Sequence, residues 1–342
     1  MVERHRAELH AHCYRMLGSV HDADDALQDT LLRAWRGAAG LRDNASARSW
    51  LYRIATNVCL TEITRRSQRF LPHDFGPAAE ALTPPGMPIT ESVWLEPYPD
   101  GSLGLPHGRA TPEASYEQHE GIELAFVAAL QHVGAQQRAV LILREVLGFT
   151  AKETAAMLAT TVAAVNSALQ RARETVTERV PGRTQQATLR SLGDVGLREL
   201  VERYVQAWER CDVEAFTALL VHDATFAMPP LTTWYTPRAT IADWARTTSL
   251  SGAWRWKTVL TRANAQPALA FYAWDGPVGA YLPFALNVLT LRGHLVSDVT
   301  AFIVRATDAP EAEAYLRFPE QPMDSERLSG TFDRFNLPGQ LR

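Results

Sequence analysis

The polar side chains between residues 166 and 173 have the types and the spacing needed to read a DNA sequence. An arginine can bind guanine through two hydrogen bonds, and glutamine or asparagine can bind adenine in the same way, each pair contributing ~1–3 kcal/mol of discrimination. If residues 162 to 173 are helical, Val162, Val165 and Leu169 face inward and the polar side chains share the opposite face. These are Asn166, Ser167, Gln170, Arg171 and Arg173. The segment predicts a helix that lies in a DNA major groove.

A second short helix is needed to position this one. Thr150 followed by Glu153 is a capping box, in which each residue accepts a hydrogen bond from the backbone N–H of the other. Thr160 and Thr161 then interrupt the helical pattern, and such residues cap a following helix. The apolar side of the first helix consists of Ala155, Met157 and Leu158. Together the two segments predict a helix-turn-helix.

Length and charge place this motif in a larger protein. The chain has 342 residues, enough for two or three domains, and a formal net charge of −4. Residues 42 to 69 nevertheless contain six arginines and two acids, whereas residues 71 to 120 contain one arginine and eight acids. Because nucleic-acid affinity depends on local charge, the basic segments remain candidates for DNA contact.

Several other classes of protein are disfavoured. Cys13, Cys59 and Cys211 lie far apart without metal-ligand or disulfide spacing, so no metal or cofactor is expected. The sequence lacks a signal-peptide pattern and an apolar run of ~18 residues. A cytoplasmic protein without membrane contact is the expectation.

Two N-terminal segments are predicted to be amphipathic helices. In residues 21 to 35, Asp22, Asp25 and Asp29 share one face, which is either an acidic docking surface or simply a solvated helix start. The buried stripe is predicted to contain Leu27, Leu31, Ala34 and Trp35.

The next helix, residues 46 to 66, is predicted to bury Trp50, Leu51, Ile54, Ala55 and Val58. It exposes Arg48, Arg53, Asn57, Arg65 and Arg66, which suit single-stranded DNA but also an ordinary basic surface.

Proline excludes long helices from residues 71 to 112. This linker contains an apolar cluster that should require a covering surface, which we expect a neighbouring domain to supply. The cluster consists of Trp94, Leu95, Pro97 and Tyr98.

From residue 197 the pattern changes to two helices followed by strands. The predicted strands are residues 254–261, 268–274, 284–291 and 295–304, with a hairpin at Gly293 and His294. Helices followed by a mostly antiparallel sheet indicate a small α+β domain.

The first half of the chain resembles the extracytoplasmic function (ECF) group of bacterial sigma-70 factors. HCYRMLGSVHDADDALQDTLLRAWRG is similar to regions 2.1 and 2.2, SWLYRIATNVCLTEITRR to regions 2.3 and 2.4, and residues 125 to 177 to region 4. The resemblance implies that an acidic helix binds the coiled coil of the polymerase β′ subunit, through Asp22, Asp24, Asp25, Gln28 and Asp29.

The resemblance also implies two promoter contacts. Asp43, Asn44, Ala45, Ser46 and Asn57 would hold the melted −10 element, although the loop reads DNAS where the family has a Gly/Arg/Ser-rich stretch. The five polar residues at 166 to 173 would read the −35 element, with Arg173 near phosphate. Asn166 stands where many relatives have a basic residue.

The last third resembles a SnoaL-like domain of the nuclear transport factor two-like superfamily, in which a curved sheet and helices form a cone. WLEPYPD and FDRFNLP are also similar to the SigG-like sigma factors that carry this domain. Several residues could line a pocket, although a role in the core is favoured: Met228, Trp234, Tyr235, Phe271 and Phe302. No spacing among Asp212, His222, Asp223, His294 and Asp298 specifies an acid–base pair, so catalysis is not expected.

The resulting expectation is a multidomain chain of two all-α sigma modules and an α+β cone. Its predicted divisions are residues 1–70 (region 2), 71–117 (linker), 118–182 (region 4), 195–308 (SnoaL-like domain) and 309–342 (tail). The expected function is that of a sigma factor regulated by its fused domain, with core RNA polymerase and promoter DNA as partners. A ligand-sensing DNA-binding regulator and a SnoaL-type enzyme with a DNA-binding module are the alternatives. A small-molecule ligand of the C-terminal domain is possible, but no residue pattern supports one.

Overall fold

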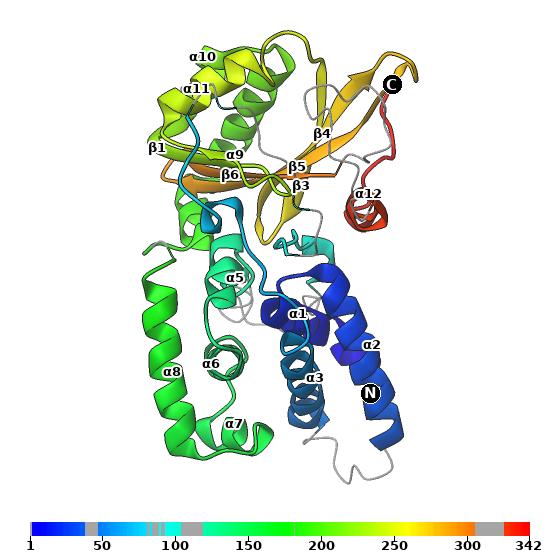
Figure 1. The fold of residues 1–342 in the computed structure, drawn as a ribbon, viewed down its shortest axis with the longest axis vertical. Helices are drawn as coiled ribbons and strands as arrows, with labels where there is room; N and C mark the ends of the chain where they lie inside the picture. Colours follow the sequence, from blue (N-terminus) through cyan, green and yellow to red (C-terminus); the bar gives the residue numbers. More distant parts are fainter. Residues whose placement is uncertain are drawn as a thin grey trace. The chain divides into compact units, whose positions relative to one another are not determined.

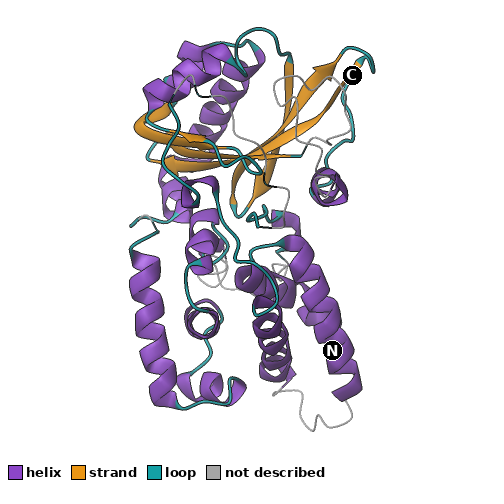
Figure 2. Cartoon of the chain, in the orientation of Figure 1, coloured by secondary structure: helices purple, strands orange, loops and turns teal. Residues whose placement is uncertain are grey.

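A computed structural model describes residues 2–37, 47–80, 83, 89, 93–103, 119–180, 182–304 and 325–342. The chain divides into two compact units (Figure 1). The first combines Met1–Phe70 with Leu95–Gly182, and the second combines Leu71–Trp94 with Arg183–Arg342. The predicted linker is therefore shared between the units. Figure 2 shows that the described strands belong to the second unit, whereas the first is helical.

Three mutually packed helices begin the first unit, after a short 3-10 turn η1 (Val2–His5). They are α1 (Arg6–Leu17), α2 (Val20–Gly37) and α3 (Ala47–Ile63). Gly18 ends α1 with a φ of 70°, and a Cβ at this position would lie 2.9 Å from Leu95 Cδ1. A glycine is needed here for its left-handed backbone and for this close approach.

The same unit contains a second helical group, which includes the predicted helix-turn-helix. The group consists of α5 (Leu124–Gln131), α6 (Ala135–Leu141), a π-helical turn η6 (Ile142–Val146), α7 (Ala151–Met157) and α8 (Val162–Thr177), and α7 with α8 forms the helix-turn-helix. Helix α8 packs on α6 and α7, and α3 packs on both α6 and α7. The helix-turn-helix and the three N-terminal helices thus form one packed body.

The second unit is built on a six-stranded sheet. Helices α9 (Gln185–Glu209) and α10 (Val213–Thr217) precede strand β1 (Leu220–Ala227), and α11 (Arg238–Thr247) follows the short strand β2 (Trp234–Tyr235). The remaining strands are β3 (Trp256–Ala263), β4 (Gln266–Asp275), β5 (Ala280–Arg292) and β6 (Leu295–Ile303).

The strand order is β2-β1-β6-β5-β4-β3, and every pair is antiparallel except β1 with β6. Strands β3 to β6 correspond to the four predicted strands, and the predicted α+β architecture is confirmed. Helix α12 (Ser325–Arg334) places Phe332 against Tyr272 of β4, with 5.2 Å between ring centroids.

Aromatic side chains fill the interior between the sheet and its helices. Trp208 of α9 lies 5.2 Å from Phe216 and 4.9 Å from Phe271, measured between ring centroids. Four of the five residues considered as a pocket lining are also buried, with at most 6 % of their surface exposed: Met228, Tyr235, Phe271 and Phe302. Trp234, the fifth, is half-buried and donates from Nε1 to the carbonyl of Gly76 at 2.9 Å. The four buried residues therefore belong to the packed core of the cone.

The first part of the linker lies along the β2 edge of the sheet. Ala79 forms a parallel bridge with Tyr235, and its N–H donates to the carbonyl of Trp234 at 2.8 Å. Ile89 donates to the carbonyl of Pro230 at 3.0 Å. Short 3-10 turns, η4 (Pro72–Asp74) and η5 (Asp100–Ser102), flank this stretch and the apolar cluster.

Candidate nucleic-acid interface

Helix α8 presents a polar face to solvent. Val165, Leu169 and Ala172 are buried against α6 and α7, and Asn166, Ser167, Gln170, Arg171 and Arg173 are all exposed. Val162 was expected to face inward, and this expectation is wrong, because 43 % of its surface is exposed. It is the first residue after the cap, and Ala163 and Ala164 are exposed as well, so burial begins only at Val165.

Two threonine caps hold the helix-turn-helix in shape. The Thr150 Oγ1 accepts from the Glu153 N–H at 3.2 Å, and the Glu153 carboxylate accepts from the Thr150 N–H at 2.7 Å. Hydrogen bonds from Thr150 lower the pKa of Glu153, so this capping contribution is present at neutral pH and is lost as the pH falls through the lowered pKa. Thr161, and not Thr160, caps α8 by accepting from the Ala164 N–H at 3.1 Å.

We expect Thr161→Ala to lower the free energy of unfolding by about 1 kcal/mol, because the first turn of α8 loses its side-chain acceptor. Urea unfolding measures this loss. Thr160→Ala is the matched control, since Thr160 is an exposed neighbour outside the cap, and it should change stability by less than about 0.5 kcal/mol. Equal losses in the two variants would contradict the assignment.

Ion pairs distinguish the basic side chains of α8. The Arg173 guanidinium is paired with the carboxylate of Glu145 in η6, whereas Gln170 donates to Glu174 at 3.3 Å. A phosphate that approached Arg173 would therefore compete with an acid already in place. Arg171 is exposed and, among the described residues, forms no ion pair with a carboxylate.

Helix α2 presents an acidic face to solvent, but one of the acids predicted to belong to that face is buried. Asp24, Asp25 and Gln28 are exposed, and Asp29 is half-buried and pairs with Arg33 at 2.7 Å. The side chain of Asp22 is only 2 % exposed. Asp22 is therefore not available as a contact for polymerase in this structure.

Asp22 instead joins the start of α2 to the segment that follows α3. One carboxylate oxygen accepts from Arg66 and the other from Arg69, whose side chain is 3 % exposed. The Ser19 hydroxyl also accepts from the Asp22 N–H at 3.1 Å. This buried ion pair gives Asp22 a structural role.

Two apolar residues continue the acidic face toward the end of α2. Trp35 was predicted to be buried, and this prediction is wrong, because 78 % of its surface is exposed, together with 48 % of Leu32. Asp25, Gln28, Leu32 and Trp35 recur at intervals of three or four residues, so they form one exposed stripe. That same spacing was the signal in the sequence that could have assigned Trp35 to the outside.

Helix α3 combines exposed and engaged residues. Arg53 and Asn57 are exposed, whereas the predicted −10 loop, Asp43 to Ser46, lies outside the described residues. The Arg48 guanidinium is not simply solvated, because it lies 4.7 Å from the ring centroid of Phe149 and donates to the carbonyl of Leu147 at 3.4 Å. Trp50 and Ile54 are half-buried, short of the full burial predicted.

Buried polar groups also connect α1 with the second helical group. The Arg138 guanidinium of α6 donates to the Met16 carbonyl at the end of α1, and the Arg15 Nε donates to the Gly121 carbonyl at 2.7 Å. Burial lowers the pKa of Arg138 to about 10, which leaves the side chain charged at neutral pH. These contacts hold the helix-turn-helix against the N-terminal helices.

The apolar cluster of the linker is covered by the first unit, contrary to the expectation of a neighbouring domain. Leu95, Pro97 and Tyr98 are buried, and the Tyr98 hydroxyl lies 2.8 Å from His10 Nδ1 of α1. The Tyr14 hydroxyl also donates to the Glu96 carbonyl at 2.7 Å. Only Trp94 is assigned to the second unit, where its ring lies 4.9 Å from that of Phe75.

Glu96 has a role at the start of α2 that the sequence did not reveal. Its carboxylate accepts from the Ser19 hydroxyl at 2.9 Å, the Val20 N–H at 2.8 Å and the His21 N–H at 3.3 Å. It therefore caps α2 from 75 residues away in the sequence, and no local helix-capping pattern could have predicted this.

The polar candidates of the second unit are dispersed. Asp212 caps α10 by accepting from the Ala215 N–H at 2.9 Å, and Asp223 pairs with Arg292. Asp298 accepts from Thr225 at 2.7 Å, while His222 and His294 are exposed. The described residues contain no acid cluster suited to a metal ion.

Comparison with known proteins identifies both helical groups. Residues 1–69 match the family model for Sigma-70 region 2, and residues 123–176 match that for Sigma-70 region 4. The ECF RNA polymerase sigma factor SigG of Mycobacterium tuberculosis is 40% identical over 306 residues, which cover 88% of this chain and 80% of SigG. SigM of the same organism is 30% identical over 173 residues, or 51% of this chain and 71% of SigM.

The fold has a counterpart as well. The crystal structure of the Mycobacterium tuberculosis extracytoplasmic function sigma factor SigJ matches with a TM-score of 0.53 at 19% identity, over 92% of this chain and 97% of SigJ. Within the described residues, no helix is long and apolar enough to cross a membrane. The chain belongs to the ECF family of RNA polymerase sigma factors, which bind core polymerase and promoter DNA and direct the start of transcription without catalysing a reaction themselves.

Proposed function

We propose that the exposed stripe of α2 is the surface that binds core polymerase, at the coiled coil of the β′ subunit. The observation that carries this proposal is the continuity of acidic Asp25 and Asp29 with the exposed Leu32 and Trp35. A partner helix with basic and apolar residues on one face complements such a stripe, because the charges steer the encounter and the apolar side chains are buried on binding. Gln28 also belongs to this stripe, Asp24 and Asp29 lie beside it, and Asp22 is excluded by its burial.

The promoter contacts are assigned to the other two helices. We propose that Asn57 of α3, with the loop of residues 43 to 46, holds the melted −10 element. The polar face of α8 would read the −35 element, with Asn166, Ser167, Gln170 and Arg171 at base edges and Arg173 near phosphate after release from Glu145. The exposure of all five side chains on one helical face supports this role.

Replacing Arg171 by alanine tests the −35 assignment. We expect binding to a cognate promoter duplex to weaken by ~1–3 kcal/mol, and discrimination at one base position to relax. Arg179→Ala is the matched control, because Arg179 is an exposed arginine just beyond α8. A uniform, salt-dependent loss of the same size in both variants would contradict base reading and indicate phosphate contact alone.

We further propose that the fused domain regulates the sigma modules through the linker. Ile89 donates a hydrogen bond to the Pro230 carbonyl of the second unit. Leu95 donates to the Phe70 carbonyl of the first unit, and Glu96 accepts from Val20 at the start of α2. Only five residues of the sequence separate Ile89 from Leu95. A change at that edge would reach the proposed polymerase-binding helix through Glu96.

Regulation has a clear target in the first unit. Arg138 and Arg48 hold the second helical group against α1 and α3. The −10 and −35 promoter elements are centred about 25 base pairs apart, which corresponds to about 85 Å of duplex. We infer that the two modules separate when both elements are bound, because α3 packs on α6 and α7 in this structure.

Removal of residues 190 to 342 tests this regulation. We expect promoter-dependent transcription or core binding to change, in a variant whose helical content is confirmed by circular dichroism. Unchanged output together with unchanged core binding would contradict the proposal.

A further inference from the structure

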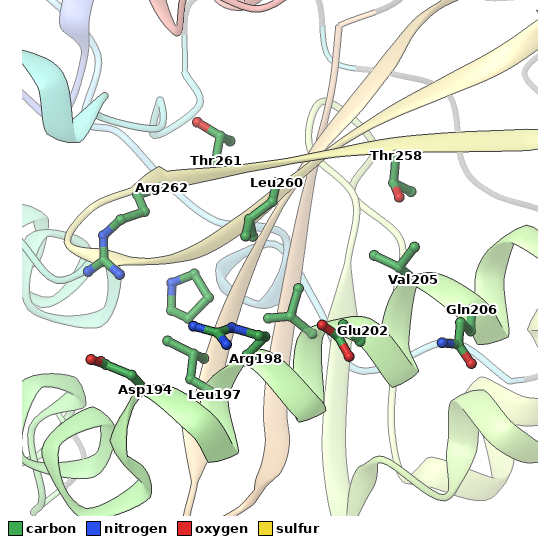
Figure 3. Close-up of a pocket in the computed structure, with 12 residues that line it drawn as sticks. Asp194, Leu197, Arg198, Glu202, Val205, Gln206, Thr258, Leu260, Thr261 and Arg262 are labelled. Atoms are coloured by element: carbon green, nitrogen blue, oxygen red, sulfur yellow. The ribbon is translucent and has the colours of Figure 1, made fainter.

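A groove of about 510 Å³ runs between α9 and β3 in the second unit (Figure 3). Its floor is apolar and comes from Leu197, Val201 and Val205, which are four residues apart on α9, and from Leu260 and Pro267. Leu260 has 61 % of its surface exposed and therefore adds accessible apolar surface to the groove. The volume is in the range of sites that bind small molecules or a few residues of a peptide.

One wall of the groove is an edge of the sheet. Strand β3 ends the strand order, and within the described residues it pairs with β4 alone. The backbone carbonyl of Arg255 accepts from the backbone N–H of Trp274 in β4. The backbone N–H of Thr258 instead points away from β4 and donates to the Glu209 carboxylate at 3.1 Å. Because these directions alternate along a strand, the N–H and C=O of Leu260 also point away from β4. Figure 3 shows the side chains of Thr258 and Leu260 turned toward α9, with Thr261 turned the opposite way.

The opposite edge of the same sheet is already occupied. There, the extended segment around Ala79 bridges to Tyr235 and donates to the Trp234 carbonyl at 2.8 Å. This sheet therefore accepts an added extended segment at β2. Exposed edges pair readily with other extended chains, and the edge beside Leu260 has the same capacity.

The charges along the groove narrow the choice of occupant. Asp194, Arg198 and Glu202 form a ridge on α9 at intervals of four residues, and Arg262 lies on the facing strand. A ligand with a single charge would meet carboxylates and guanidinium groups together. An extended peptide can instead place an acidic side chain beside an arginine and a basic side chain beside a carboxylate, while its apolar residues enter the floor.

We propose that this groove binds an extended peptide segment of a partner protein, which adds to the sheet as a strand beside β3. The backbone of the peptide pairs with the N–H and C=O of Leu260, and an apolar side chain packs among Leu197, Val201 and Leu260. Side chains of both charges flank that apolar residue. A helix beside an open strand is an arrangement that peptide-binding domains use for strand addition, since backbone bonds give affinity and the pocket gives specificity.

A random ten-residue peptide display library, panned on the full-length chain, provides the probe. We expect enriched peptides to alternate apolar and polar residues, and a synthetic copy to bind in fluorescence anisotropy. Leu260→Glu should weaken binding by at least about tenfold, because it places a charge in the apolar floor. Val278→Glu is the matched control, since Val278 is 57 % exposed in the β4–β5 hairpin, and it should bind as the wild type does.

Hydrogen exchange distinguishes strand addition from other modes of binding. Bound peptide should slow exchange of the Leu260 amide in the wild-type chain. Peptides that bind Leu260→Glu as well as the wild type, or that leave the Leu260 amide unprotected, would overturn the proposal. A wild-type dimer that Leu260→Glu converts to monomer would overturn it too, because the groove would then be an interface between two copies.

Discussion

Replacing Asp22 by alanine is expected to lower the free energy of unfolding by about 3–5 kcal/mol. The Asp22 and Arg69 side chains are 2 % and 3 % exposed, so removal of the carboxylate leaves a buried guanidinium without its counter-charge. Arg66 loses the same acceptor, and the start of α2 loses its ion pairs with the segment that follows α3. Urea unfolding followed by circular dichroism measures the change.

Asp29→Ala is the matched control on the same helix. Asp29 forms an ion pair with Arg33 at 2.7 Å, but both side chains are about half exposed, at 45% and 50%. Such a surface pair contributes at most ~1 kcal/mol. If Asp22→Ala were as mild as Asp29→Ala, the buried pair would not be what holds α2 on α3.

Reversing the charge at Asp25 is expected to reduce affinity for core polymerase by at least about tenfold, because a basic partner surface would face a like charge. The Asp25 side chain is 68% exposed and lies 3.5 Å from Arg66, so Asp25→Arg should leave the fold nearly as stable as the wild type.

Trp35→Ala should weaken the binding of core polymerase by about 2 kcal/mol or more, as expected of an aromatic anchor.

The control for Asp25→Arg is Asp243→Arg on α11. Asp243 is 58% exposed and pairs with Arg246 at 2.9 Å, so its chemistry and exposure are similar. Core binding should be unaffected by this change. A parallel loss in both variants would indicate a general charge effect instead of a specific surface.

Local rules predicted the helix-turn-helix well. The Thr150–Glu153 box and the inward spacing of Val165 and Leu169 depend on residues within one or two turns, which a sequence displays directly. The same rules could not decide between Thr160 and Thr161 as the cap, because both are threonines at adjacent positions. Strands β3 to β6 were also found from their composition.

Long-range partners explain what the sequence did not show. Asp22 and Asp25 have the same residue type and similar spacing, but arginines more than 40 residues away bury the first and leave the second exposed. Glu96 caps a helix that lies far earlier in the chain. Trp35 was assigned to the buried stripe of α2 on helical spacing, but it follows the exposed positions Asp25, Gln28 and Leu32 instead, and 78 % of its surface is exposed.

The most direct measurement is a binding titration of the purified full-length chain with purified core RNA polymerase, run in parallel with Asp25→Arg. We expect a saturable complex with the wild-type chain, and a complex at least about tenfold weaker with the variant. Equal binding of the two chains would contradict the acidic stripe of α2 as the polymerase contact.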